Sequence, residues 1–155
     1  MASDSVLRIK VETSVQKTEA TLQIKKLETE CDKWVKLVRI RYNKNDKPGA
    51  EEALKKLKIS REKLVRYKKI HEALENVSDI TDMQKMIAVL AKSKGLLTSN
   101  VTQMGGLDSV LRDIHTASSS SGEGDSGVNV SMMDLAKEAL SDAQFRDYAS
   151  RHPPE

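Results

Sequence analysis

Apolar residues recur at helical spacing along two long stretches of the chain. In the first stretch the residues are separated by 4, 3, 4, 3 and 4 positions, at Ala20, Ile24, Leu27, Cys31, Trp34 and Val38. In the second stretch spacings of 3 and 4 alternate in the same way, at Ala50, Ala53, Leu57, Ser60, Leu64, Tyr67, His71 and Leu74. This alternation is typical of a helix that buries one stripe of side chains against a partner helix. Each stretch therefore predicts one long helix with a coiled-coil seam.

The residues between the two stretches favour a tight turn. They read NKNDKPG from Asn43 to Gly49, and Asn, Asp, Pro and Gly each stop a helix or favour turn dihedrals. We expect a first helix over about 5–42 and a second helix that begins at Pro48 or Gly49 and ends near Asn76. Because a short loop makes neighbouring helices antiparallel, the two seams should pack together in a hairpin over about 5–77. The predicted hairpin core consists of Ile24, Leu27, Cys31, Trp34, Val38, Leu57, Leu64 and His71.

Shorter helices are predicted over about 79–115, which would complete a helical core over 1–116. Ser78 or Asp79 is a suitable N-cap, and apolar residues follow at helical spacing, at Met83, Met86, Ile87, Leu90 and Leu97, and then at Leu107, Val110, Leu111 and Ile114. Residues 117–130 are rich in Ser and Gly and predict a flexible linker. Residues 131–150 predict one C-terminal amphipathic helix with Leu135, Leu140 and Phe145 on its apolar face. The predicted fold class is all-α.

The composition favours an elongated helical assembly over a sphere with a thick core. Hydrophobic residues make up 38% of the chain, aromatic residues 3% and charged residues 32%. The single cysteine, Cys31, excludes an intramolecular disulfide and a multi-cysteine zinc site, and His71 has no second ligand at metal-binding spacing. We therefore predict no metal and no cofactor. No apolar run approaches the ~20 residues that span a bilayer, so we expect a cytoplasmic protein that associates with membranes peripherally.

Positive charge is concentrated around the predicted turn. From Lys33 to Lys69 there are 14 basic and four acidic residues, a net charge of +10. Such a density predicts an acidic partner, which an anionic membrane surface would supply. The predicted membrane-binding residues are Lys33, Lys36, Arg39, Arg41, Lys55, Lys56, Lys58, Arg61 and Lys63. Nucleic acid is the weaker alternative, because modules that bind single strands interleave aromatic residues with basic ones and aromatic residues are few here.

The two parts of the chain carry opposite charge. Residues 1–74 contain 19 basic and 11 acidic residues, whereas residues 75–155 contain seven and 12. The C-terminal helix is therefore predicted to fold back on the basic hairpin and to leave it when the protein assembles. The alternative is a helix that binds a partner through Leu135, Leu140 and Phe145. The sequence gives no indication of catalysis, because it contains no Gly-rich phosphate loop, no nucleophile motif and no histidine cluster. We expect a protein that is not an enzyme.

The order of these elements resembles the ESCRT-III family of membrane-remodelling proteins, also called charged multivesicular body proteins. The resemblance covers roughly Glu19 to His115 and includes the stretch ALKKLK just after the turn and the segment MGGLDSVLRDI. It implies a subunit that binds endosomal membranes, polymerises with itself and with other ESCRT-III-like subunits, and serves vacuolar and multivesicular body sorting. It also implies an AAA ATPase as a partner. The ATPase-binding motif of the family is approximated only loosely, by Asp134, Leu135, Ala136, Lys137 and Leu140.

The same pattern also fits two other classes of protein. A coiled-coil adaptor or tether would form a fixed oligomer and would not respond to lipid. A basic helical arm that binds RNA would lose affinity steeply as salt is raised. Sedimentation with anionic liposomes, with RNA and with buffer alone distinguishes the three classes.

Overall fold

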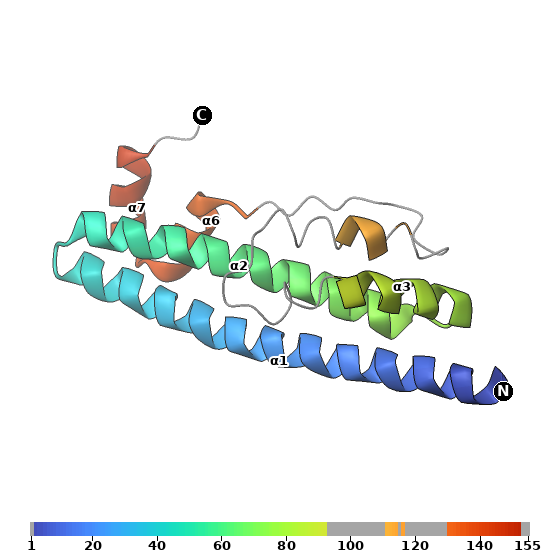
Figure 1. Cartoon of the computed structure of the whole chain (residues 1–155). Coiled ribbons are helices and arrows are strands. Elements are labelled where there is room, and N and C mark those ends of the chain that lie inside the picture. Colours follow the sequence, from blue (N-terminus) through green and yellow to red (C-terminus); the bar gives the residue numbers. More distant parts are fainter. Residues whose placement is uncertain (1, 93–110, 115, 117–129, 153–155) are drawn as a thin grey trace. The chain divides into compact units, whose positions relative to one another are not determined.

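The computed structural model of the chain describes residues 2–92, 111–114, 116 and 130–152. The regular elements in these ranges are all helices, which confirms the predicted all-α class (Figure 1). They are α1 (Ala2–Asn43), α2 (Lys47–Asn76), α3 (Ile80–Lys92), α6 (Met132–Ala139) and α7 (Asp142–Arg151). The predicted positions Leu97, Leu107 and Val110 and the predicted linker up to residue 129 lie outside the described residues.

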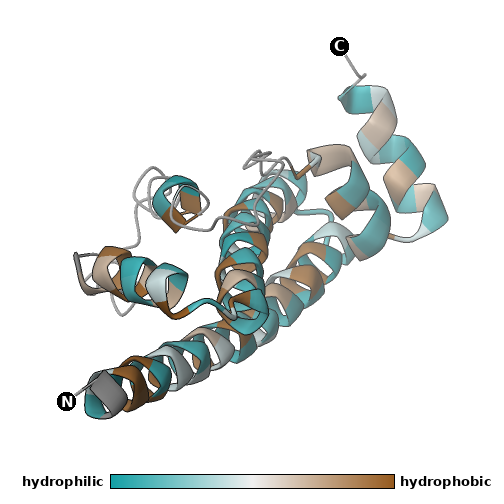
Figure 2. Ribbon diagram, turned by 90° about the vertical axis from the view of Figure 1, so that its right-hand side faces the viewer, coloured by the Kyte–Doolittle hydropathy of each residue, from teal (hydrophilic) through white to brown (hydrophobic). Residues whose placement is uncertain are grey.

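The bounds of the two long helices agree with the sequence pattern to within a few residues. Helix α1 has 42 residues and α2 has 30, and hydrophobic and hydrophilic segments alternate along both (Figure 2). Helix α3 begins where Asp79 caps it, since the Oδ1 atom of Asp79 accepts a hydrogen bond of 2.7 Å from the backbone N–H of Thr81. This contact confirms Asp79 as the N-cap of the third helix.

The C-terminal segment differs from the prediction, because it forms two helices and not one. The chain leaves the helical conformation at Leu140, where φ is −104° and ψ is 155°. Ser141 then caps α7, since its side chain accepts from the backbone N–H of Gln144 and the Gln144 side chain accepts from the backbone N–H of Ser141. This reciprocal capping box stabilises a new helix start and so breaks the predicted single helix.

The chain divides into two compact units. Unit 1 comprises Met1–Lys25 and Val65–Val128, and it contains the first part of α1, the last part of α2, and α3. Unit 2 comprises Lys26–Leu64 and Asn129–Glu155, and it contains the two helix ends that flank the turn together with α6 and α7. We call residues 26–64 the hairpin tip, and α6 and α7 together the tail helices.

Each unit has its own set of buried apolar side chains. In unit 1 the buried side chains are Ala20, Tyr67, Ile70, Leu74, Met86, Leu90, Leu111 and Ile114. In unit 2 they include Leu27, Cys31, Val38, Ala50, Ala53, Leu54, Leu57 and Leu64 on the hairpin tip. Five of the eight predicted core residues are therefore buried, namely Leu27, Cys31, Val38, Leu57 and Leu64.

The other three predicted core residues, Ile24, Trp34 and His71, are only half-buried, which corrects the prediction. His71 lies at the edge of the seam, where its Nδ1 atom is 3.4 Å from the carboxylate of Glu75. Trp34 has the ammonium groups of Lys33 and Lys56 over its ring, at 4.8 and 5.1 Å from the centroid. Its indole Nε1 is buried and has no hydrogen-bond partner among the described residues.

Helix α2 buries a second stripe beside the seam because each unit adds a third layer to the hairpin. Ile70 is 1% exposed and lines the same cavity as Leu90 of α3. Leu54 is also 1% exposed, and it shares a helix face with Glu51 and Arg61, three residues before it and seven after it. Those two residues contact the tail helices, so this second stripe faces the elements that follow the hairpin.

We predict that the buried leucines of α2 dominate the stability of the hairpin. Replacing Leu57, which is fully buried, by Ala should lower the free energy of unfolding by about 2–5 kcal/mol. Ile59 is 49% exposed on the same helix and is the matched control, because Ile59→Ala should change stability by no more than about 0.5 kcal/mol. Denaturant unfolding followed by circular dichroism measures both. Equal losses in the two variants would contradict the seam.

Candidate functional site

The turn at the hairpin tip is built by hydrogen bonds that end α1. The backbone N–H of Asp46 donates to the carbonyl of Arg41 at 2.8 Å, and that of Asn45 donates to the carbonyl of Tyr42 at 3.0 Å. Asn45 has a φ of 62°, the left-handed conformation that Asn tolerates better than most residues. These features define a Schellman motif, which satisfies the last carbonyls of α1 and reverses the chain.

Asp46 then caps the start of α2. Its Oδ1 atom accepts a hydrogen bond of 3.1 Å from the backbone N–H of Gly49. A Cβ atom on Gly49 would lie 2.2 Å from the Asp46 carboxylate, so glycine is the residue that leaves this cap in place. Arg41 closes the turn, since its Nη1 donates to the carbonyl of Gly49 at 3.0 Å. Helix α2 thus begins at Lys47, one residue before the predicted start.

Helix α6 contacts the hairpin tip through two arginines. The Nη1 and Nη2 atoms of Arg61 donate to the two carboxylate oxygens of Glu138 at 3.2 and 3.0 Å, in a bidentate pair. The Nε atom of Arg39 donates to the backbone carbonyl of Ala139 at 3.1 Å. That carbonyl belongs to the last turn of α6, where the helix dipole favours a cation. The fold-back of the C-terminal segment onto the basic hairpin is therefore present in unit 2.

Arg61 also links α6 to the seam of the hairpin. Its guanidinium is hydrogen-bonded to the thiol of Cys31, which is 3% exposed. The hydrogen bond with Glu138 raises the pKa of Arg61 above its usual value. Burial raises the pKa of Cys31, and the hydrogen bond with Arg61 opposes that rise. Cys31 therefore stays a thiol and serves as a small packed residue at the centre of this layer.

Helix α7 contacts the hairpin on both sides of the turn. The hydroxyl of Tyr42 donates to the carboxylate of Asp147, and the Nζ atom of Lys47 lies 3.2 Å from the same carboxylate. The hydrogen bond with Tyr42 and the charge of Lys47 lower the pKa of Asp147. The pKa of Tyr42 shifts in the opposite direction. Burial is the larger cause and the Asp147 carboxylate the smaller one, and together they raise this pKa to about 12. The pair is most stable with a neutral phenol and an ionised carboxylate.

A second cluster holds the end of α7 on α2. The Oε1 atom of Glu51 lies 3.0 Å from Nη2 of Arg151 and 2.6 Å from Nε2 of His152. The ring of His152 stacks on that of Tyr148 at a centroid distance of 4.6 Å, and Tyr148 is buried. The side-chain amide of Gln144 donates to Asn43 at the end of α1. Polar contacts from α7 thus reach the last turn of α1 and the first two turns of α2.

Of the three residues predicted on the apolar face of the C-terminal segment, Leu135, Leu140 and Phe145, the two leucines are buried. Leu135 and Leu140 are 2% and 6% exposed, and Ala136 and Ala139 are fully buried beside them. Phe145 is only half-buried, because the break at Ser141 gives α7 a helix phase of its own. Tyr148 takes the buried position on α7 instead.

The nine predicted membrane-binding residues fall into groups with different surroundings. Arg39 and Arg61 contact α6, and Arg41 is held by the turn. Lys58 and Lys63 are half-buried. Lys33, Lys36, Lys55 and Lys56 are exposed, although Lys56 lies 3.7 Å from Glu52 and shares the Trp34 ring with Lys33. The structure therefore separates a group of exposed lysines from the arginines that hold the tail helix α6.

Sequence reasoning missed the residues that pair across the layer. They are Tyr42, Glu51, Glu138, Asp147, Arg151 and His152. These contacts join residues about 80–105 positions apart in the chain, so no local spacing indicates them. The capping box at Ser141 and Gln144 did carry a signal, since Ser followed three residues later by Gln marks a helix start.

No helix in the described part of the chain combines the length and the apolar character that crossing a bilayer requires. The same residues contain no group of three or more His, Cys, Asp or Glu side chains that could hold a metal ion. Comparisons with protein-family models, with curated proteins and with solved structures found no match.

We predict that Tyr42 reports docking of α7 through its titration. Because its pKa is raised from 10 to about 12, its contribution to docking is complete below pH 10 and is lost as pH rises towards 12. An ultraviolet titration of the phenols should show one group with a midpoint near pH 12, absent from Tyr42→Phe. Asp147→Asn removes the negative charge and should lower that midpoint. A wild-type curve with no such late phenol would contradict the docked arrangement.

Proposed function

We propose that the protein is an ESCRT-III-like subunit that binds anionic membranes through the hairpin tip and polymerises there to remodel or sever membrane necks in endosomal sorting. We place it in the cytoplasm, from where it would associate with endosomal membranes peripherally. The observation that carries the proposal is the position of the tail helices. They contact two arginines of a strongly basic tip and leave Lys33, Lys36, Lys55 and Lys56 exposed.

The basic residues of the tip can bind one of two anionic partners, the end of α6 or a lipid surface. Glu138 satisfies both Nη atoms of Arg61, and the end of α6 satisfies Nε of Arg39. An anionic lipid surface offers the same chemistry and contributes on the order of 1 kcal/mol for each basic side chain near it. The exposed lysines would make the first contact, and the two arginines would join it once α6 has left. Membrane binding and tail docking would therefore compete.

The docking contacts are suited to reversal. The ion pair of Arg61 and Glu138 is partly exposed, and pairs of this kind contribute no more than about 1 kcal/mol. Most of the docking free energy comes from the buried apolar residues Leu135, Leu140 and Tyr148. A difference of a few kcal/mol between two binding modes moves a population from closed to open. Several lysine contacts with a membrane would supply such a difference.

The docked position of α6 also determines when an AAA ATPase would bind as a partner. The loose match to the ATPase-binding motif of the family includes Leu135 and Leu140, and both side chains are buried in unit 2. An adaptor domain that grips these leucines would need the open form. Release of the tail on the membrane would thus precede recruitment of the ATPase, which limits disassembly to the assembled protein.

We predict that reversing Glu138 opens the protein. In Glu138→Arg the ion pair with Arg61 is replaced by repulsion, so the open population should rise roughly tenfold or more. Co-sedimentation with phosphatidylserine-containing liposomes should increase, and electron microscopy of the pellet should show more polymer. The double variant Arg61→Glu/Glu138→Arg restores the pair with the charges exchanged and should return to the wild-type level. Wild-type behaviour of Glu138→Arg would contradict control by the tail.

Membrane binding itself is tested by reversing the exposed lysines Lys33, Lys36, Lys55 and Lys56 to Glu. Within the described part of the chain none of these side chains makes an ion pair or hydrogen bond with α6 or α7, so the tail should stay docked. Four reversals should abolish liposome binding, and raised salt should weaken it in the wild type. Binding that survives both changes would exclude the hairpin tip as the membrane-binding surface.

A further inference from the structure

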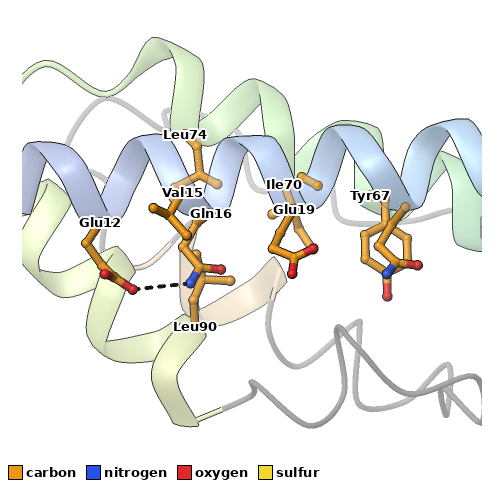
Figure 3. Close-up of a pocket in the computed structure, with 10 residues that line it drawn as sticks. Glu12, Val15, Gln16, Glu19, Tyr67, Ile70, Leu74 and Leu90 are labelled. Carbon is orange, nitrogen blue, oxygen red and sulfur yellow. Dashed lines mark hydrogen bonds between the residues drawn. The ribbon is translucent and has the colours of Figure 1, made fainter.

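Unit 1 contains an apolar groove that the proposed function does not use. It has a volume of about 190 Å³ and lies where α1, α2 and α3 meet (Figure 3). Four residues that line it are buried almost completely: Tyr67, Ile70 and Leu74 from α2, and Leu90 from α3. The groove therefore offers an aliphatic and aromatic surface to a side chain that enters from outside.

One side of this groove is acidic. Helix α1 contributes Glu12 and Glu19, with Val15 between them, and Val15 is 47% exposed. The two glutamates are seven residues apart, which is about 10.5 Å along a helix. Gln16 donates one hydrogen bond of 3.5 Å to Glu12 (Figure 3). No lysine or arginine is among the described residues that line the groove, although the whole chain is basic. The surface fits an aliphatic side chain that has cations on either side.

Helix α2 presents such a side chain on the hairpin tip. Ile59 is 49% exposed, and Lys55 and Lys63 lie four residues before and after it on the same helix face. The two lysines are about 12 Å apart along the helix, close to the separation of the two glutamates. One carboxylate, that of Glu62, is also near Ile59 in the sequence. We call Lys55, Ile59 and Lys63 the basic ridge.

We infer that the basic ridge of one copy docks in the acidic groove of a second copy. Ile59 would enter beside Val15, while Lys55 and Lys63 would pair with Glu12 and Glu19. The two surfaces are different patches of one chain, so each bound copy leaves one groove and one ridge free for the next. The inference rests on the proposed function, since it names the contact through which copies would polymerise. An anionic membrane is a poor occupant, because the groove carries two carboxylates.

Ile40 is also exposed on the tip and has Lys36 and Lys44 at the same distances in sequence. Lys44 is the C-cap of α1, however, since its backbone N–H donates to the carbonyl of Ile40 at 3.1 Å and the turn with the Asp46 carboxylate follows directly. The helix therefore runs on past both lysines around Ile59, whereas around Ile40 it stops at Lys44. This difference supplies a matched control within the same protein.

The test is a charge exchange between two full-length variants. The groove variant carries Glu12→Lys and Glu19→Lys, and the ridge variant carries Lys55→Glu and Lys63→Glu. The wild type should associate as its concentration is raised in sedimentation velocity experiments without lipid. Each variant alone should associate at least tenfold more weakly, because like charges then face each other. An equal mixture of the two should associate as the wild type does when the two variants alternate. The Glu ridge of one variant then meets the Lys groove of the other, and the unchanged Lys ridge meets the unchanged Glu groove.

Single apolar substitutions test the same contact. Ile59→Ser should weaken association of the full chain about as much as the charge reversals, and Ile40→Ser should leave it unchanged. Ile40, Ile59, Glu12 and Lys55 are exposed, Glu19 and Lys63 are half-buried, and circular dichroism checks that each variant keeps its helices. A wild type that stays monomeric at every concentration, or a mixture that associates no better than its parts, would overturn the inference.

Liposome binding separates this inference from the proposed function. The groove variant keeps every basic residue of the tip, so its membrane binding should persist even when its self-association is lost. If the mixture of the two variants fails to recover self-association while liposome binding is intact, the contact between copies is refuted and the proposed function stands. Successful exchange by a protein that does not bind anionic liposomes would refute the proposed function and leave the contact between copies in place.

Discussion

Helices α6 and α7 have eight and ten residues, too few for either to be stable alone in water. Their existence depends on the surface that the hairpin tip provides. Leu135, Leu140 and Tyr148 are buried in unit 2, and each leucine buried from water contributes roughly 1.5–3 kcal/mol. The polar contacts then select one orientation, because Arg61, Tyr42 and Glu51 each meet a specific partner. Apolar burial stabilises the layer, and the ion pairs determine its register.

This dependence explains how a small change at the tip controls the two tail helices. Whatever displaces Glu138 from Arg61 removes a contact that orients α6, and because α6 and α7 contact each other, the loss of α6 also weakens the docking of α7. Anionic lipid is the competitor that the charge of the tip favours most. In the function proposed here, a membrane surface therefore both recruits the protein and releases the helices that restrain it.

The long helices could be predicted from the sequence because their signals are local. The alternation of 3 and 4 places Leu57 and Leu64 in the seam, and the residues from Asn43 to Gly49 mark the turn. Ile24, Trp34 and His71 follow the same alternation but are only half-buried. Leu54 and Ile70 lie outside the alternation and are buried, because the helices that follow the hairpin cover a second stripe of α2. The charge split predicted the fold-back of the tail. The pairing of Arg61 with Glu138 depends on tertiary placement, which spacing along the chain does not encode.

Hydrogen exchange of the full chain tests directly whether the hairpin tip binds either the tail helices or a membrane. In solution the backbone amides of α6 and α7 should be protected, since helices this short are protected only while docked. With phosphatidylserine-containing liposomes the same amides should exchange fast, while those of α2 stay protected. Tail amides that exchange fast without lipid, or that keep their protection on the membrane, would contradict this competition for the tip.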